Sequence, residues 1–113
     1  MVASVVADLK ALAEELDEEC ARELAGAFLE DAANEMSAVD QCIASQNAGE
    51  LKAHAHALKG CCRTIKAEDA EAVCTEFESA AIAADWGKIS SLRPLLQMRY
   101  DELCAFIHGY LGS

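Results

Sequence analysis

The chain has 113 residues and a formal net charge of −11, with 20 acidic side chains against 9 lysines and arginines. This length suits one domain with a single modest core. The negative charge argues against nucleic acid and anionic membranes as partners, because both are bound through basic surfaces. No apolar run is long enough to span a bilayer, and the N-terminus does not resemble a secretory signal, so we expect a cytoplasmic protein.

The composition favours an all-α fold, because alanine, leucine and glutamate are abundant while the chain has one proline and six glycines. Its six cysteines include no Cys-x-x-Cys pair. Without a secretory signal we expect reduced thiols that pack as small hydrophobic groups. A zinc site made of Cys61, Cys62 and a histidine is an alternative with poor ligand spacing, so we expect no resident metal or cofactor.

The sequence predicts five amphipathic helices, of which the first two are separated by Asp17. The first runs from about Ser4, a candidate N-cap, to Glu15. The second follows Asp17, which can cap it, and ends near Ala44. Apolar residues recur at helical spacing along both helices: Val5, Leu9, Leu12 and Leu16, then Leu24, Phe28, Ala32, Met36, Val39 and Ile43.

Three further helices are predicted over residues 49–66, 68–84 and 88–110. Asn47 can cap the first of them, residues 85–87 (Asp-Trp-Gly) break the pattern before the last, and Pro94 either kinks or restarts that last helix. Their expected core positions are Leu51, Ala55, Leu58, Cys62, Ile65, Ala72, Val73, Phe77, Ala80, Ala81, Ile89, Leu92, Leu96, Tyr100, Leu103 and Ile107.

Short connections between amphipathic helices favour antiparallel neighbours. We therefore expect an antiparallel up-down-up-down four-helix bundle with a short additional N-terminal helix. A single domain then covers residues 1–113, with the leading helix in residues 1–16 and the bundle in residues 17–113.

Two histidines lie two positions apart on the third predicted helix, and helical geometry separates them. When the apolar stripe is placed at zero, His54 lies roughly 60° away, at the edge of the core, and His56 roughly 140° away. Four cations lie on the side of His56, between roughly 60° and 120°. They are Lys52, Lys59, Arg63 and Lys66.

An exposed neutral imidazole beside cations suits phosphoryl transfer. Its free nitrogen can attack phosphorus, while Lys and Arg stabilise the charge on the phosphoryl oxygens. Gly60, one turn beyond His56, costs about 1 kcal/mol relative to alanine in a helix, which suggests that a partner needs the space. The alternatives are an ordinary solvated basic face for His56 and a partly buried structural role for His54. His108 carries no functional weight.

The string AHALKG, residues 55–60, resembles the His-x-Leu/Ile-Lys-Gly signature of histidine-containing phosphotransfer (HPt) domains. Residues 74–78 (Cys-Thr-Glu-Phe-Glu) and residues 28–30 (Phe-Leu-Glu) are similar to flanking segments of that family, and the likeness extends from about residue 17 to the C-terminus. The resemblance implies that His56 is phosphorylated and that Lys59 helps to hold the phosphate. It also implies that Gly60 leaves space for the partner and that Arg63 supports the site.

The resemblance further implies a histidine phosphocarrier of a multistep phosphorelay and not an autonomous enzyme. The carrier would take a phosphoryl group from an aspartate of one receiver domain and pass it to another, in response regulators or hybrid sensor kinases. Magnesium would belong to the receiver, and we expect the carrier to be a monomer without a cofactor. The basic face around His56 is expected to steer it toward the acidic receiver pocket.

Two positions depart from the family pattern. Cys61 and Cys62, which are small but oxidisable, follow the Lys-Gly pair, and Lys66 stands where the family commonly has a glycine that ends the helix. The end of the third helix and the direction of the Lys66 side chain are therefore left open. Two other functions also stay open: a docking or adaptor module whose His56 is never phosphorylated, and a metal- or redox-responsive bundle that uses Cys61, Cys62 and His54.

Overall fold

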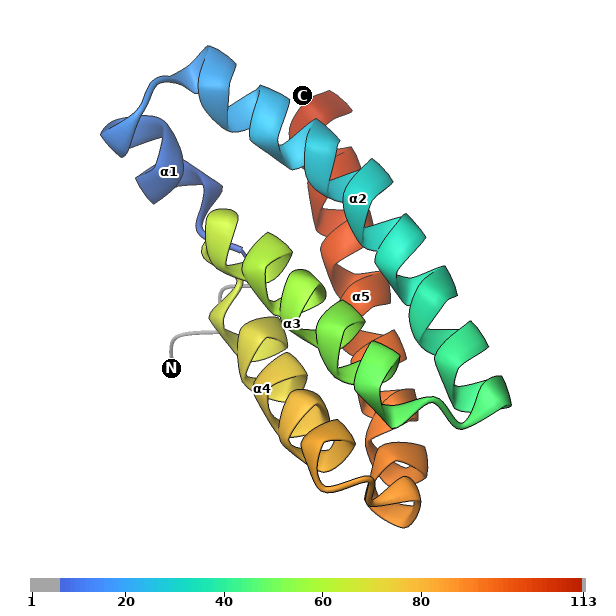
Figure 1. Cartoon of the computed structure of the whole chain (residues 1–113). Coiled ribbons are helices and arrows are strands. Elements are labelled where there is room, and N and C mark those ends of the chain that lie inside the picture. The colour runs from blue at the N-terminus through green and yellow to red at the C-terminus, as the bar shows by residue number, and fades with distance from the viewer. Residues whose placement is uncertain (1–6, 113) are drawn as a thin grey trace.

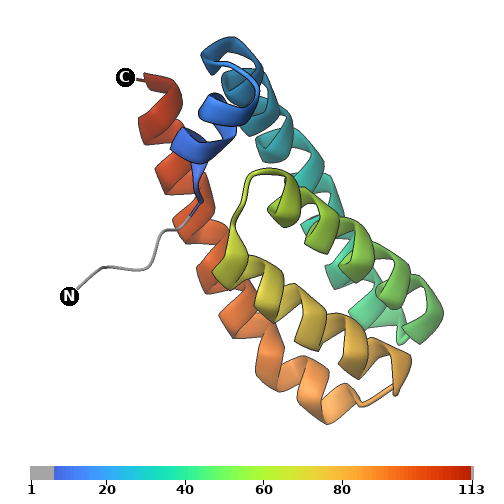
Figure 2. The ribbon, with the colours of Figure 1, turned by 90° about the vertical axis from the view of Figure 1, so that its left-hand side faces the viewer.

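The computed structural model describes residues 7–112, which form five α-helices. The helices are α1 (Leu9–Glu15), α2 (Glu18–Ser45), α3 (Ala48–Thr64), α4 (Glu68–Ile82) and α5 (Trp86–Gly112). The prediction of an all-α fold is confirmed. Helices α2 to α5 pack side by side and are joined by short connections, while α1 lies at the end where α2 begins and α3 finishes (Figures 1 and 2). None of the described helices is long and apolar enough to cross a bilayer.

The predicted caps of the second and third helices are confirmed. The Asp17 carboxylate accepts a hydrogen bond from the backbone N–H of Cys20 at 2.7 Å, and the Asn47 side chain accepts one from the N–H of Glu50 at 3.1 Å. Each side chain satisfies a backbone donor that has no partner within its own helix. The short turn between α2 and α3 therefore sets where α3 starts, and with it the direction of every side chain on α3.

The predicted start of the first helix is wrong within the described residues. Asp8 is the N-cap of α1 and accepts a hydrogen bond from the N–H of Ala11 at 2.9 Å, so the helix begins at Leu9. Asp8 precedes a short apolar stretch and can fill the role that the sequence suggested for Ser4. Ser4 and Val5 themselves lie outside the described residues.

The last helix begins earlier than predicted. Asp85 accepts a hydrogen bond from the N–H of Lys88 at 3.1 Å, so Trp86 and Gly87 form the first turn of α5 instead of a break. Helix α5 continues through Pro94 without restarting. A proline can be accommodated where its missing N–H and its ring face solvent and the flanking turns pack on the core. Pro94 is exposed, which agrees with this explanation.

The core lies between α2, α3, α4 and α5 and confirms most of the predicted apolar positions. Two of them are wrong: Leu16 is exposed in the turn between α1 and α2, and Ala72 faces solvent on α4. The buried face of α4 carries Ala70 and Cys74 instead, at helical spacing with the residues that follow. The largest fully buried side chains are Phe77, Leu9, Leu51, Ile65, Ile89, Leu103, Ile107 and Val39.

Helix α3 ends at Thr64, two residues before the predicted end, because Lys66 adopts a left-handed conformation with φ of 57°. The N–H of Ala67 donates to the carbonyl oxygen of Cys62 at 2.9 Å and closes the helix end. This geometry explains why a glycine is the usual choice here. The Lys66 ammonium lies 3.0 Å from a carboxylate oxygen of Glu15 and so points toward α1.

We expect Lys66→Gly to be more stable than Lys66→Ala by about 1 kcal/mol. Both variants lose the ion pair with Glu15, but only glycine adopts a positive φ without strain. Urea unfolding of the two variants measures the difference. At Lys52, an exposed position inside α3, the same two substitutions should reverse in order, with alanine more stable by about 1 kcal/mol. Equal stability of the two Lys66 variants would contradict the left-handed conformation.

Candidate functional site

His56 projects from α3 into solvent beside α4. Its side chain is 68% exposed, and its Nδ1 lies 2.8 Å from Oε2 of Glu78, a residue of α4. A carboxylate can only accept a hydrogen bond, so the neutral imidazole carries its proton on Nδ1 and donates it to Glu78. The lone pair of the neutral ring is then on Nε2, at the open side of the imidazole.

The Glu78 carboxylate also binds the ammonium group of Lys59. Its Oε1 accepts a hydrogen bond from Nζ of Lys59 at 2.7 Å, and its side chain is only 13% exposed. The hydrogen bond from Lys59 is the main cause that lowers the pKa of Glu78, and the hydrogen bond from His56 adds to it. Glu78 therefore stays ionised at neutral pH and holds His56 and Lys59 together.

The cations farther along α3 are paired within the chain. Arg63 donates to a carboxylate oxygen of Glu71 on α4, with an Nη2–O distance of 2.8 Å, and Lys66 pairs with Glu15. Arg63 lies two helical turns from His56, so the structure places it beside the site without bringing its guanidinium to the imidazole. Of the four cations that the sequence predicted on this face, three therefore pair with carboxylates of neighbouring helices, while Lys52 is exposed inside α3.

Gly60 opens one side of α3 next to a groove against α2. A Cβ atom built on Gly60 would meet no atom within 4 Å, so packing inside this chain does not require the glycine. The groove has a volume of about 440 Å³. Its lining residues come from α2 and from the end of α3: Leu24, Ala27, Phe28, Asp31, Gly60, Cys61, Thr64 and Ile65.

His54 faces the opposite neighbour. Its Nδ1 lies 2.8 Å from Oε2 of Glu35 on α2, and its side chain is 31% exposed, which confirms the prediction of a partly buried residue. The structure therefore separates the two histidines as the helical geometry predicted. The Nδ1 of each of these two histidines has one carboxylate partner, on α2 for His54 and on α4 for His56.

The six cysteines all lie within the described residues and are free thiols. Cys62 is buried, and its hydrogen bond with Cys74 of α4 is the main cause that raises its pKa. Burial raises the pKa of the half-buried Cys61. Both thiols are therefore held in the protonated, unreactive form. Among residues 7–112, Cys61, Cys62 and His54 do not gather into a possible metal site.

Glu78 is the site residue that sequence reasoning missed. Glu78 is the last residue of the segment 74–78 that resembles the family pattern. This position was the only feature of the sequence that could have identified it as a site residue. Its role depends on the packing of α4 against α3, which brings together residues 22 and 19 positions apart. Helical periodicity describes one helix at a time and does not show which carboxylate an adjacent helix presents.

The stability contributed by Glu78 should depend on pH. Its folded-state pKa lies below the ordinary value of 4.5. The ionised carboxylate therefore stabilises the folded protein fully above that value and less as the pH falls through the folded-state pKa. We expect Glu78→Gln to cost about 1–2 kcal/mol at pH 7 and less below pH 4.5. Urea unfolding across this range provides the measurement.

Glu76→Gln is the matched control, because Glu76 is an exposed residue on the same helix. Its substitution should change the free energy of unfolding by less than about 0.5 kcal/mol. A cost of Glu78→Gln that stays constant from neutral to acidic pH would contradict the assigned ion pairs.

Comparison with known proteins gives one family. The Hpt domain family matches residues 23–106, from the first part of α2 to near the end of α5. Searches of curated proteins and of solved structures gave no match. The matched segment contains both His56 and Glu78 and covers most of the chain. This chain belongs to the Hpt domain family.

Proposed function

We propose that this chain is a histidine phosphocarrier of a multistep phosphorelay, with His56 as the residue that is phosphorylated. The observation that carries the proposal is an exposed imidazole whose Nδ1 is held 2.8 Å from the carboxylate of Glu78. This arrangement presents Nε2 to a partner and keeps the ring in one tautomer and one orientation. Membership of the Hpt domain family supports the same function.

In the proposed reaction, Nε2 of His56 attacks the phosphorus of a phosphorylated receiver aspartate. A P–N bond forms, the P–O bond to the aspartate breaks, and the leaving carboxylate keeps the electron pair. The proton stays on Nδ1, so the imidazole becomes positively charged, and the adjacent Glu78 carboxylate stabilises that charge. Attack by the aspartate of a second receiver then reverses these changes and releases the histidine.

Lys59 is positioned to stabilise the transferred group. Its ammonium has three N–H donors, of which Glu78 accepts one, so it can keep this hydrogen bond and donate another to a phosphoryl oxygen. Arg63 lies farther along α3 and would support the charge of the site from its ion pair with Glu71. In this proposal Lys59 contacts the phosphoryl group directly, whereas Arg63 acts from about two helical turns away.

The partner in this proposal is a receiver domain of a response regulator or a hybrid sensor kinase. The groove beside Gly60 offers a binding surface of mixed character, since Leu24 and Phe28 lie near Asp31 and Thr64. Helices α2 to α5 would act as an up-down-up-down bundle in a single domain, with α1 as a short leading helix. Magnesium and the phosphorylated aspartate belong to the partner, so the chain needs no kinase activity of its own. In this proposal it is a monomeric carrier in the cytoplasm.

Phosphate uptake from phosphorylated receiver domains tests the proposal. Intact mass should show one acid-labile, base-stable phosphoryl group on the wild-type chain and on His54→Gln, and none on His56→Gln. His54→Gln is the matched control, because it removes the other histidine of the same helix. If no receiver of a broad panel transfers phosphate while some still bind, the chain is a docking module and the proposal is wrong.

Gly60→Ala should separate folding from partner binding. We expect it to raise the free energy of unfolding by about 0.5–1 kcal/mol, because the new methyl group meets nothing within 4 Å and alanine favours the helix. Binding to a receiver that donates phosphate should weaken at least tenfold, because the methyl group enters the space of the partner. Urea unfolding and a binding titration measure the two effects.

Gly26→Ala on α2 provides the control for this experiment. A Cβ atom at Gly26 also meets nothing within 4 Å, and Gly26 does not line the groove. It should therefore stabilise the chain by a similar amount and leave receiver binding unchanged. If Gly60→Ala bound the receiver as tightly as the wild type does, the groove beside Gly60 would not be the surface that contacts the receiver.

A further inference from the structure

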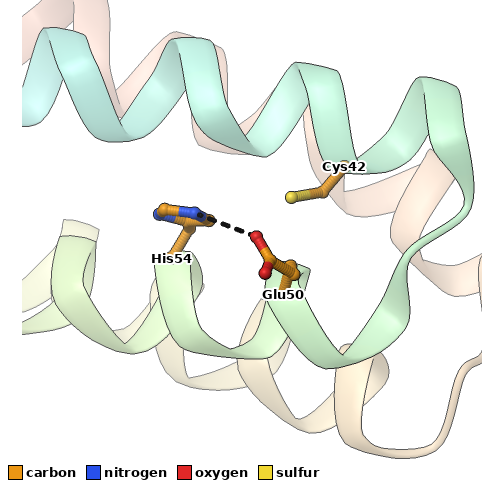
Figure 3. Close-up of side chains that lie close together, drawn as sticks. All are labelled: Cys42, Glu50 and His54. Carbon is orange, nitrogen blue, oxygen red and sulfur yellow. Dashed lines mark ion pairs between the residues drawn. The ribbon is translucent and has the colours of Figure 1, made fainter.

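A cluster of potential metal ligands lies at the end of the bundle where α2 turns into α3. One ligand atom from each of Cys42, Glu50 and His54 lies within 4.8 Å of the others. The three side chains converge between the two helices (Figure 3). Among residues 7–112 this is the one group of three His, Cys, Asp or Glu side chains with such spacing. The proposed phosphotransfer uses none of the three.

His54 is already oriented toward this cluster. The Nδ1–H of the neutral ring donates to Glu35 at 2.8 Å, so the lone pair is on Nε2. Nε2 lies 3.9 Å from an oxygen of Glu50 (Figure 3). A carboxylate that fixes the far nitrogen of a histidine is the usual support of a metal-bound imidazole. Glu35 therefore stands in the position of a residue that orients a metal ligand.

We propose that Cys42, Glu50 and His54 bind a zinc ion, with Glu35 as the residue that positions His54. A thiolate, an imidazole and a carboxylate together favour Zn²⁺ over Mg²⁺ or Ca²⁺, which prefer oxygen ligands alone. Three protein ligands leave the fourth tetrahedral position to water. On binding, the S–H bond of Cys42 breaks, its proton passes to solvent, and a Zn–S bond forms.

The cluster needs only a small rearrangement to close around the ion. Neighbouring ligand atoms of a tetrahedral zinc site lie about 3.3–3.6 Å apart, as the Zn–N, Zn–O and Zn–S bond lengths require. The Glu50 side chain is 67% exposed and free of the core, so it can supply most of the movement. The other two ligands stand on packed helices, where Cys42 is 7% exposed and His54 is held by Glu35.

The ion would join α2 to α3 across their short connection, on the side of α3 that faces away from His56. Glu50 and His54 are one turn apart on α3, while Cys42 comes from the last turn of α2. A metal that binds only the folded chain stabilises it and makes its melting temperature depend on the zinc concentration. From the sequence we expected no resident metal and considered zinc only at Cys61, Cys62 and a histidine, because spacing along the chain does not bring Cys42 near His54.

Titration of the purified apo-protein with Co²⁺ and Zn²⁺ tests the site. We expect one equivalent of Co²⁺ to produce a thiolate charge-transfer band and the visible bands of a tetrahedral site, and Zn²⁺ to abolish both. Competition with a chromophoric chelator gives the Zn²⁺ affinity. Glu50→Ala and His54→Gln should weaken it at least a hundredfold, and Glu35→Gln by about 10-fold to 100-fold. Zinc should raise the melting temperature of the wild type but not that of Glu50→Ala or His54→Gln.

Further variants show whether the metal binds at this cluster and not elsewhere in the chain. Cys42→Ala should remove the thiolate band, whereas Cys104→Ser, at a half-buried thiol of α5, should keep it. His56→Gln should bind zinc as the wild type does. The Glu50 side chain is exposed, so Glu50→Ala should still fold. Weaker zinc binding by this variant would therefore reflect the loss of a ligand and not misfolding. Absence of the thiolate band in the wild type, or unchanged zinc affinity in both Cys42→Ala and Glu50→Ala, would overturn the proposal.

Discussion

The bridge that Glu78 makes between α4 and α3 organises the site of this protein. One carboxylate, mostly removed from solvent, accepts hydrogen bonds from His56 and from Lys59 one turn later. A buried anion is costly unless it is paired and hydrogen bonded, and here both oxygens have a partner. The same contact joins two helices, orients the imidazole and holds a cation next to it. Removal of Glu78 would therefore disturb the packing of α4 on α3 and the proposed phosphotransfer together.

The rotation of about 100° per residue along α3 gives its two histidines different environments. Both donate through Nδ1 to a carboxylate, but Glu35 lies on α2 and Glu78 on α4. The exposed fractions of the side chains, 31% for His54 and 68% for His56, then decide what each can reach. The ring of His56 is open to another protein, whereas the ring of His54 lies mainly against groups of this chain. Similar local chemistry thus supports two distinct proposals.

Sequence reasoning was most successful where local rules apply. Asp17 and Asn47 were identified as caps from residue type and position, and the buried face of α3 followed from its apolar period. Sequence reasoning failed where contacts between helices determine the backbone conformation or the partner of a side chain. Lys66 takes a conformation that its residue type disfavours, because the connection from α3 to α4 requires it. The hydrogen bond between Glu78 and His56, and the proximity of Cys42 to His54, involve separate helices, so periodicity within one helix does not reveal them.

The pairing of the α3 cations also changes how charge is expected to act on a partner. Lys52, Lys59, Arg63 and Lys66 were expected to form a basic face, but the last three each lie within 3.0 Å of a carboxylate oxygen of their own chain. A paired cation gives little net positive potential, and exposed charges are largely screened beyond about 8 Å at physiological ionic strength, so these residues would attract a partner only weakly from a distance. The cations become effective only at contact, where a phosphoryl group can compete for their free N–H donors. Shape around Gly60 and short-range hydrogen bonding, more than long-range attraction, should then select the partner.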